Sequence, residues 1–540
     1  MSEFEVAIGE EPSRRFRHPH SVVRATGSAA VTAAFDTADA ALRDGYWIAG
    51  VLDYEGGLAL GVFDPPSERA EDEPREDAFA VANLGASFAG YREAIDAIAH
   101  AIYEGDVYQV NYTVAYDLLF DGDPYALYRT LAARARAPYA AYVRDGDRHV
   151  LSFSPELFLG FEGERVATKP MKGTAPLDRV RDLESAKNRA EHLMIVDLLR
   201  NDLHRICTDV RVDRIFEVER YPTFATMTST ISGALAADVP LATVFAATFP
   251  CGSVTGAPKR AAMRQIATLE RRARGAYCGS VGFLSPERRG WWNVAIRTAQ
   301  LDSARGTGRF DAGGGIVADS DADDERAEVE LKARFFTDIC AAVDPIETFA
   351  GGDETARDAH LARLGTAAAH FGRAVDPSRL LEEIAEADAA DVLVRVRMGA
   401  DGAHVERRPL ATPDQPVDIC VSPERVRSDD AMLWWKTTWR PHYDRASAFA
   451  SKHGCFDALL ANERGELTEG ARTTLFARID GVLVTPPLAA GLLPGILRAR
   501  MLASGEASER TLTLADLHAA SEIFVGNSAR GMLRARLVEA

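Results

Sequence analysis

Short apolar runs separated by glycine, proline and charged turns dominate the first half of the chain. The run 45–63 (GYWIAGVLDYEGGLALGVF) predicts two strands joined by a glycine turn, and the runs 142–173 and 277–317 predict further groups of strands. Apolar residues recur at helical spacing over 90–104 and 183–206. Consecutive strands with helices between them are typical of α+β folds with antiparallel sheets, so we predict an α+β fold rather than a regular βαβ alternation.

The pattern changes near residue 345, which suggests a domain boundary. A predicted helical run over 325–343 ends before Pro345, and glycines follow in the segment AVDPIETFAGGDE. Strands and helices then mix again to the last residue. Because domains usually hold roughly 100–200 residues, we predict two domains, 1–344 and a smaller α+β domain over 345–540.

Composition and charge exclude several classes of function. The 540 residues are 47% hydrophobic and 26% charged, which is typical of a soluble globular protein. A net charge of −18 and the lack of a basic run argue against nucleic-acid binding. No apolar run reaches the roughly 18 residues that a membrane span needs, and the first residues lack a signal pattern, so we expect a cytoplasmic protein. The six cysteines are widely spaced, which indicates neither a disulfide framework nor a zinc site.

Lysine is rare in this chain, since only seven of the 62 basic residues are lysine. Arginine serves most surface roles of a cation equally well. Lysine, unlike arginine, can lose its proton and act as a nucleophile. Each retained lysine is therefore a candidate for chemistry.

Four segments of the first domain carry unusual polar or small residues. SFSPELFL places Glu156 after a proline in an apolar stretch, and TKPMKGTAP places Lys172 before a Gly-Thr turn. PCGSVTGAPKRAAM brings Lys259 to the start of a predicted helix, where an anion could bind. AGGGIVADS contains three glycines whose N–H groups could approach a carboxylate. Taken singly, these features also fit an edge carboxylate, a solvated lysine, an ordinary loop and a flexible hairpin.

Taken together and in order, the segments YQVN, SFSPELFL, KGTAP, NRAEHLMIVDLLRND, GSVTGAPK, YCGSVGF and GGGIVADS resemble the chorismate-utilising enzymes over roughly 45–343. Within that family the chain resembles the large subunit of aminodeoxychorismate synthase. The resemblance implies antiparallel sheets with outer helices and a reaction of chorismate with ammonia. It implies that Lys172 attacks C2 of chorismate while Glu156 protonates the departing C4 hydroxyl. Related anthranilate synthases typically have alanine at position 172, so Lys172 favours aminodeoxychorismate synthesis.

The same resemblance implies a metal site and a substrate site. Glu191 and Glu328 match the carboxylates that hold Mg²⁺, although Glu328 could instead form an i,i+4 ion pair with Lys332. The residues that match the family's substrate-carboxylate contacts are Tyr277, Arg297, Gly313, Gly315 and Lys332. The chain departs from the family at Thr226, where histidine is frequent, and at Cys251, where glycine is usual. No glutamine-hydrolysing segment is evident, so ammonia would come from solution or from a separate glutamine amidotransferase subunit.

The second domain resembles fold-type IV pyridoxal phosphate enzymes, which include 4-amino-4-deoxychorismate lyase, over about 345–540. The resemblance depends on HLARL, on Lys436 after a strand-like run in LWWKTTWRPHYDRA, and on the segments 465–498 and 522–532. It implies that Lys436 forms the Schiff base with pyridoxal phosphate and that Glu469 pairs with the pyridinium nitrogen. The phosphate would be bound by Arg363 and the backbone N–H groups of Ile496 and Leu497, with Gly526 and Asn527 beside them. Thr474 stands where the family usually has asparagine.

These observations lead to the hypothesis of a bifunctional synthase–lyase that makes 4-aminobenzoate for folate synthesis, with a homodimer through the second domain as one assembly to test. One alternative is anthranilate- or isochorismate-type chemistry in the first domain. Another is a synthase whose second domain is a degenerate, cofactor-free binding module. The products formed from chorismate would distinguish the first alternative, and cofactor binding would distinguish the second.

Overall fold

The computed structural model describes residues 3–9, 14–67, 79–175, 177–221, 225–236, 238–385 and 391–540. The chain divides into two units, Met1–Cys340 and Ala341–Ala540. This division lies near the boundary predicted between residues 344 and 345.

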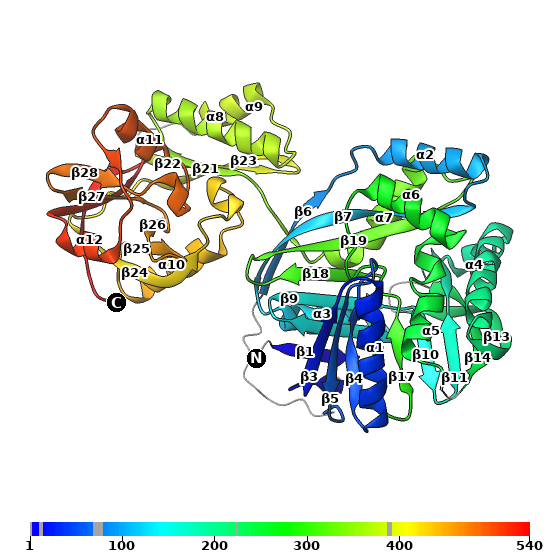
Figure 1. Ribbon diagram of the computed structural model, residues 1–540. Coiled ribbons are helices and arrows are strands. Elements are labelled where there is room, and N and C mark those ends of the chain that lie inside the picture. Colours follow the sequence, from blue (N-terminus) through cyan, green and yellow to red (C-terminus); the bar gives the residue numbers. More distant parts are fainter. Residues whose placement is uncertain are drawn as a thin grey trace. The chain divides into compact units, whose positions relative to one another are not determined.

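Two large antiparallel sheets form the first unit (Figure 1). The first sheet has the strand order β2 (Arg14–Phe16), β1 (Phe4–Ile8), β8 (Tyr139–Asp145), β9 (Arg148–Ser154), β18 (Thr298–Asp302), β19 (Thr307–Ile316), β7 (Gln109–Gly122), β6 (Phe79–Ala86), with β15 (Gly256–Ala257) paired to β7. The second has the order β12 (Met171–Ala175), β14 (Ala225–Leu235), β11 (Arg165–Lys169), β10 (Leu157–Glu162), β17 (Arg289–Asn293), β16 (Ser280–Leu284), β4 (Trp47–Leu52), β5 (Leu58–Phe63), β3 (Ser21–Ala25), with β13 (Cys207–Arg220) paired to β14.

Several strands of both sheets are buried on both faces, which explains their nearly continuous apolar sequences. In β4, Ile48 and Leu52 face a core shared with outer helices, whereas Ala49 and Val51 face a core between the sheets. The core between the sheets also contains residues of β1, β5, β8, β9 and β16. The two sheets therefore pack face to face, and the predicted strands at 45–63 are confirmed.

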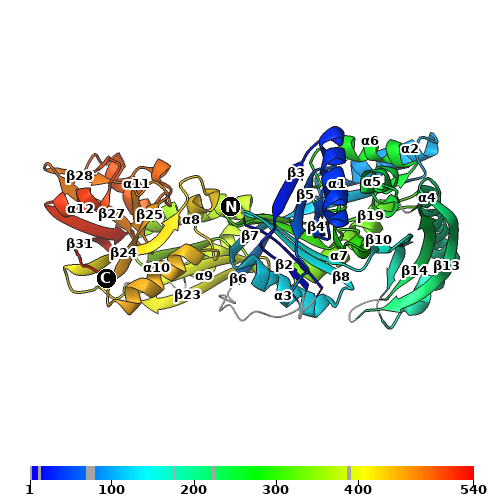
Figure 2. The ribbon, with the colours of Figure 1, turned by 60° about the horizontal axis from the view of Figure 1, so that its bottom comes forward.

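Helices cover the outer faces of the sheets. They are α1 (Ser28–Arg43), α2 (Tyr91–Tyr103), α3 (Pro124–Ala135), α4 (Ala186–His204), α5 (Leu241–Thr248), α6 (Lys259–Glu270) and α7 (Ala322–Thr337), with short 3₁₀ turns η1 (Val180–Glu184) and η2 (Gly252–Val254). Figure 1 shows α2, α6 and α7 together beside β7 and β19 of the first sheet. Helix α4 packs against the long strands β13 and β14 (Figure 2). The helices predicted over 90–104 and 183–206 are thus confirmed as α2 and α4.

The second unit has a three-stranded sheet, an eight-stranded mixed sheet and surrounding helices. The small sheet has the order β21 (Ile346–Ala350), β22 (Val392–Gly399), β23 (Gly402–Pro409), and the large one β26 (Leu467–Gly470), β25 (Asp457–Asn462), β24 (Val417–Val426), β31 (Gly531–Leu537), β30 (Glu522–Asn527), β27 (Thr474–Ile479), β28 (Val482–Thr485), β29 (Ser508–Glu509). The remaining elements are β20 (Ala341–Ala342), α8 (Glu354–His370), α9 (Pro377–Ala385), α10 (Pro441–Lys452), α11 (Ile496–Ala503), α12 (Leu514–Ala519), η3 (Ala431–Trp434) and η4 (Leu488–Ala490).

Two local predictions are wrong. The helix expected over 325–343 runs instead over Ala322–Thr337, because Phe336 is its last fully buried residue and Ala341 and Ala342 are exposed. The Asp321 side chain caps its start by accepting hydrogen bonds from two backbone N–H groups. The run before Lys436 is the 3₁₀ turn η3 rather than a strand, and the Asp430 side chain caps it through the Met432 N–H. Among the helices of the described residues, none is long and apolar enough to cross a bilayer.

Candidate active sites

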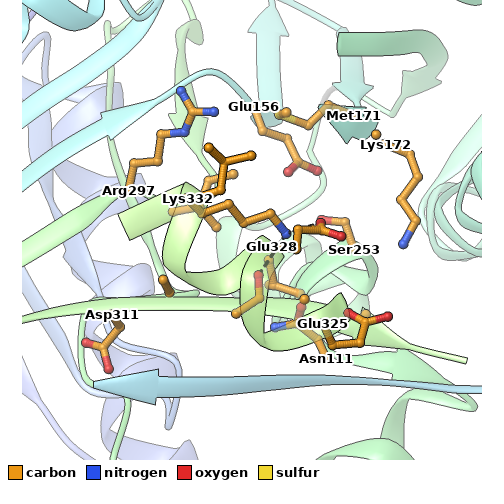
Figure 3. Close-up of a pocket in the computed structure, with 18 of the residues that line it drawn as sticks. Asn111, Glu156, Met171, Lys172, Ser253, Arg297, Asp311, Glu325, Glu328 and Lys332 are labelled. Atoms are coloured by element: carbon orange, nitrogen blue, oxygen red, sulfur yellow. Dashed lines mark hydrogen bonds and ion pairs between the residues drawn. The ribbon is translucent and has the colours of Figure 1, made fainter. Parts of the chain in front are cut away.

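A cavity of about 540 Å³ in the first unit contains all nine residues that the sequence assigned to its chemistry. They are Glu156, Lys172, Glu191, Tyr277, Arg297, Gly313, Gly315, Glu328 and Lys332. These residues come from strands, helices and loops that are far apart in sequence. In the view of Figure 3, Arg297 and Lys172 lie on opposite sides of the cavity, with Glu156 and Lys332 between them.

Lys172 lies on β12, with its Nζ 3.1 Å from Oε2 of Glu191 on α4. The next residue, Gly173, has a φ of +73°, a conformation that glycine adopts without strain. The hydroxyl of Thr226 on β14 donates a hydrogen bond of 2.6 Å to the carbonyl of Gly173. Thr226, which replaces the family's frequent histidine, therefore braces the turn that follows Lys172.

Glu156 is only 2% exposed, and its Oε1 has no hydrogen-bond partner among the described residues. Burial raises the pKa of this carboxyl to about 7, against the opposing effects of hydrogen bonds from Ser253 and the Met171 backbone and of the charge of Lys172. A carboxyl with this pKa is protonated in part at neutral pH, so it can donate a proton to a group in the cavity.

Three glycines of β19 form bare backbone along one wall of the cavity. A Cβ at Gly313 would lie 2.3 Å from the carbonyl oxygen of Tyr112. A Cβ at Gly315 would lie 2.3 Å from Nε2 of Gln109 and 3.1 Å from Nζ of Lys172. Gly313–Gly315 pair in regular antiparallel register with β7, so this segment is not a flexible hairpin. A side chain at Gly313 would collide with the backbone of β7, and one at Gly315 would press on Gln109 and Lys172.

Two cationic side chains of the cavity differ in their surroundings: Lys332 contacts oxygen atoms, and Arg297 is partly buried. Lys332 donates a hydrogen bond of 2.9 Å to the carbonyl of Gly313 and lies 2.7 Å from Oε1 of Glu328. The i,i+4 ion pair considered as an alternative role for Glu328 is thus present, although Glu328 also lines the cavity. Burial lowers the pKa of Arg297 to about 10, so its guanidinium remains charged at neutral pH.

Two carboxylates of this cavity could take part in holding a metal ion. Within the described ranges, no group of three or more histidine, cysteine, aspartate or glutamate side chains is close enough to hold a metal ion. Glu191 and Glu328 line the same cavity, and a lysine nitrogen lies 3.1 Å from an oxygen of the first and 2.7 Å from an oxygen of the second. Mg²⁺ is commonly held by one or two carboxylates, waters and an anionic substrate.

Lys259 has a structural role at the start of α6. Its Nζ lies 2.7 Å from Oδ2 of Asp202 on α4 and 2.8 Å from the carbonyl oxygen of Thr248. This pair ties the loop 250–258 to α4, and Ser253 of that loop lines the cavity. In this structure Lys259 binds protein oxygens rather than leaving its amine open to a ligand.

A second cavity, of about 220 Å³, lies beside Lys436 in the second unit. Arg363 of α8 and Pro494 also line it. The backbone N–H of Ile346 donates a hydrogen bond of 2.8 Å to the carbonyl of Lys436, which holds the lysine segment beside β21. Burial lowers the pKa of Lys436 from its ordinary value, although Glu347 opposes this shift. Of the other predicted cofactor residues, Glu469, Ile496, Leu497 and Asn527 do not line this cavity.

The loop before α11 connects Arg363 to Glu469. Oε1 of Glu469 accepts hydrogen bonds of 2.6 Å from the Tyr443 hydroxyl and 2.9 Å from the Leu493 N–H. Burial raises the pKa of Glu469 to about 7. Nη1 of Arg363 donates a hydrogen bond of 2.7 Å to the carbonyl of Pro494, the residue after Leu493.

The start of α11 provides an anion-binding feature that fits a phosphorylated cofactor. Its N-cap is Gly495, which has no side chain to bind the first N–H groups of the helix. A Cβ at this position would lie only 2.9 Å from the hydroxyl oxygen of Thr474. Helix N-terminal N–H groups, a nearby arginine and a buried lysine amine are the groups that pyridoxal phosphate requires. Asn527 instead braces its own turn, through the Arg472 carbonyl and the Arg530 N–H.

Comparison with known families decides the identity of the first unit. Residues 6–338 match the family described as chorismate binding enzyme. The chain belongs to this family. Residues 349–538 match amino-transferase class IV, so the chorismate-binding unit is followed by a class IV aminotransferase unit. Both resemblances inferred from the sequence motifs are confirmed at the level of the family.

Curated relatives of the chorismate-binding unit differ in the reactions for which they are named. The chain is 40% identical to aminodeoxychorismate synthase component 1 of Klebsiella aerogenes over 242 residues. This aligned region covers 43% of this chain and 53% of that protein. Over 255 residues it is 37% identical to anthranilate synthase component 1 of Saccharolobus solfataricus, 45% of this chain and 60% of that protein. The chain therefore spans little more than half the length of the curated relatives it matches.

Solved structures support the fold of the chorismate-binding unit. The menaquinone-specific isochorismate synthase of Escherichia coli superposes with a TM-score of 0.52 over 62% of this chain and 89% of that chain, at 19% identity. The prediction of antiparallel sheets with outer helices is therefore confirmed.

Several residues of the two cavities were missed by the sequence analysis. Asn111 and Ser253 line the first cavity and lie inside the motifs YQVN and GSVTGAPK. Glu325 also lines it, and its position three residues before Glu328 on one helix was a usable signal. Glu347 lines the second cavity from β21. A charged residue in an otherwise apolar strand was its only signal in the sequence.

Proposed function

We propose that the chorismate-binding unit converts chorismate and ammonia to 4-amino-4-deoxychorismate, and that the class IV unit eliminates pyruvate from this compound to give 4-aminobenzoate. The observation that carries the proposal is a lysine, Lys172, in one cavity with a buried carboxyl, Glu156, whose pKa burial raises to about 7. Relatives named aminodeoxychorismate synthase component 1 support the same reaction.

In the first unit, the neutral amine of Lys172 would attack C2 of chorismate. The double bonds of the ring would shift, the C4–O bond would break, and the proton of Glu156 would leave with the hydroxyl as water. Ammonia would then attack C4, the double bonds would shift back, and the C2–N bond to Lys172 would break. The lysine is thereby regenerated, and an amino group replaces the C4 hydroxyl.

Binding in the first unit would combine a metal with cations. Glu191 and Glu328 would hold Mg²⁺, which would bind a carboxylate of the substrate and neutralise its charge. Arg297 and Lys332 would bind carboxylate oxygens of the substrate, and their position in the lining of the cavity that contains Lys172 supports this role. The Tyr277 side chain and the backbone of Gly313 and Gly315 would complete the wall.

In the second unit, pyridoxal phosphate would serve as an electron sink that permits loss of a proton from C4 of the aminated ring. Lys436 would hold the cofactor and then take up that proton. Glu469 would face the pyridine nitrogen, and Arg363 with the N–H groups of Ile496 and Leu497 would bind the phosphate. Loss of pyruvate makes the ring aromatic, so this second step would draw the first forward.

Partners and location follow from this chemistry. Ammonia would come from solution or from a separate glutamine amidotransferase subunit. A homodimer would form through contacts between the class IV units of two chains. A role in folate synthesis would place the protein in the cytoplasm.

The proposal is tested by identifying products by chromatography after incubation with chorismate, ammonium and Mg²⁺. We expect 4-amino-4-deoxychorismate without pyridoxal phosphate, and 4-aminobenzoate and pyruvate when the cofactor is added. Formation of 2-aminobenzoate or isochorismate would instead indicate that the first unit is an anthranilate synthase or an isochorismate synthase. Accumulation of 4-amino-4-deoxychorismate despite added cofactor would indicate that the class IV unit is a binding module.

A second test uses the pH dependence of the first step. Because Glu156 donates a proton only when protonated, the ratio of the wild-type kcat/KM for chorismate to that of Glu156→Gln should fall as the pH rises through about 7, the pKa to which burial raises this carboxyl. Glu156→Gln should lower kcat/KM by roughly 10²–10⁴-fold and remove that limb of the profile. Free ammonia must be held constant at each pH.

The matched control is Glu162→Gln, which changes an exposed glutamate on the neighbouring strand β10. It should keep both the rate and the pH profile. Wild-type and Glu156→Gln profiles of the same shape between pH 6 and 8 (a window of about one unit on each side of that pKa) would contradict a role for Glu156 as the acid.

A further inference from the structure

Glu347 is a buried carboxylate beside the lysine of the class IV unit. It is the second residue of β21 and is only 1% exposed. The segment before it pairs with the lysine segment, because Pro345 and Thr437 form a bridge and the Ile346 N–H donates to the carbonyl of Lys436. Backbone pairing thus brings the Glu347 side chain next to Lys436.

Three basic side chains surround this carboxylate. Oε1 accepts a hydrogen bond of 2.6 Å from Nε of Arg363, and Oε2 accepts one of 2.9 Å from Nη2 of the same residue. Oε2 also lies 2.7 Å from Nδ1 of His360 and 3.6 Å from Nζ of Lys436. The two-point contact fixes the plane of the guanidinium, which a single contact would not do.

His360 connects this group to a distant turn. The imidazole is 2% exposed, and its Nε2 lies 2.5 Å from the hydroxyl of Ser528. Both ring nitrogens are therefore engaged, one by Glu347 and the other by the turn that follows β30. The position of the Glu347 carboxylate is thereby set from two sides, by α8 and by this turn.

We propose that Glu347 is a positioning residue of the cofactor site, which orients Arg363 towards the phosphate and supplies the negative charge next to the Lys436 nitrogen. This inference rests on the proposed function, since it takes pyridoxal phosphate as the ligand of the class IV unit. It goes beyond that function because Glu347 would act through Arg363 and Lys436 rather than on the substrate.

The charge of the carboxylate follows from its neighbours. Burial by itself would raise the pKa of Glu347, but Lys436, His360 and Arg363 together hold it below its usual range. Lys436 is also influenced by the positive charges of Arg363 and Arg440. At the Lys436 nitrogen, the negative charge of Glu347 therefore opposes the positive charges of Arg363 and Arg440. Without it, a positive charge on that nitrogen would be disfavoured.

The test compares Glu347→Gln with Asp344→Asn in the full-length protein. Two quantities are measured by titration: the dissociation constant of pyridoxal phosphate, and the pH midpoint of the change in the absorption band of the bound cofactor. We expect Glu347→Gln to lower the midpoint by about 1–3 pH units, because an adjacent opposite charge is lost. We expect the dissociation constant to rise about tenfold or more, the size usual when a group that orients a ligand-binding side chain is removed.

Asp344 is the matched control because it is a buried carboxylate of the same segment that also pairs with two arginines. It is 3% exposed, and its oxygens lie 3.2 Å from Nη2 of Arg373 and 2.7 Å from Nη1 of Arg397. Neither arginine lines the cavity of Lys436. Asp344→Asn should therefore lower the melting temperature and leave the midpoint and the dissociation constant unchanged.

A third variant, Glu347→Asp, separates charge from position. It keeps the negative charge on a shorter side chain, so the midpoint should stay near that of the wild type while cofactor affinity falls. If Glu347→Gln and Glu347→Asp lower the melting temperature but keep the wild-type midpoint and affinity, the residue is only structural and the inference is wrong. If the wild-type protein itself shows no cofactor band, the proposed function of the class IV unit fails, and this inference fails with it.

Discussion

Lys172→Ala is expected to lower the rate of 4-amino-4-deoxychorismate formation from chorismate and ammonium by at least about 10³-fold. A loss of this order is typical when a covalent nucleophile is removed. The alanine methyl group cannot form the transient C2–N bond, and water does not replace it at a defined position. The KM for chorismate should change much less, because Arg297 and Lys332 still line the cavity. Initial rates measured by chromatography give both quantities.

Lys169→Ala is the control for this result. Lys169 lies three residues earlier on β11, is partly buried and forms an ion pair with Glu219, but it does not line the cavity. Both variants remove a lysine amine from an ion pair, so a general effect on stability should affect both. A Lys172→Ala protein with more than a tenth of the wild-type rate (a loss of under about 1.4 kcal/mol in activation free energy) would rule out Lys172 as the nucleophile.

Lys436→Ala is expected to stop the pathway after its first step. The protein should still consume chorismate, but 4-amino-4-deoxychorismate should accumulate and 4-aminobenzoate should fall by at least about 10³-fold. The reason is that Lys436 would both hold pyridoxal phosphate and carry the proton from C4. The absorption band of the bound cofactor should also disappear, which can be measured without any substrate.

The second unit offers a simple control, since its other lysine is Lys452. That residue is exposed at the last position of α10. Lys452→Ala should retain the band and the yield of 4-aminobenzoate. If Lys436→Ala still forms 4-aminobenzoate at the wild-type rate, the elimination takes place elsewhere, and the class IV unit has a role other than catalysis.

The sequence predicted the elements whose patterns are local. The apolar runs of β4 and β5, the apolar periodicity of α2 and α4, and the glycine-rich motif of β19 each appear in a short window of residues. The family resemblance carried by the ordered motifs assigned nine residues of the first unit, and all nine line one cavity. The roles of those residues remain predictions that the variants above test.

Features that depend on distant partners could not be predicted from the sequence. The bond from the Thr226 hydroxyl to the Gly173 carbonyl joins residues 53 positions apart. The contact between Glu347 and Arg363 requires β21 to pack on α8. Likewise, the raised pKa of Glu156 results from burial by several segments. Such properties arise only when the sheets and helices have packed, so no short stretch of sequence specifies them.

The bare backbone of Gly313–Gly315 limits how the selectivity of the first unit can be altered by directed evolution. Changes at Gly313 should mostly yield inactive clones, because a Cβ there would lie 2.3 Å from the backbone oxygen of Tyr112. A Cβ at Gly314 or Gly315 would press against the side-chain ends of Glu325 or Gln109. The variable part of the cavity is its apolar lining, which includes Met171, Ile296 and Leu331. Libraries intended to accept a different ring or a bulkier nucleophile should be built there, with the glycine wall kept as it is.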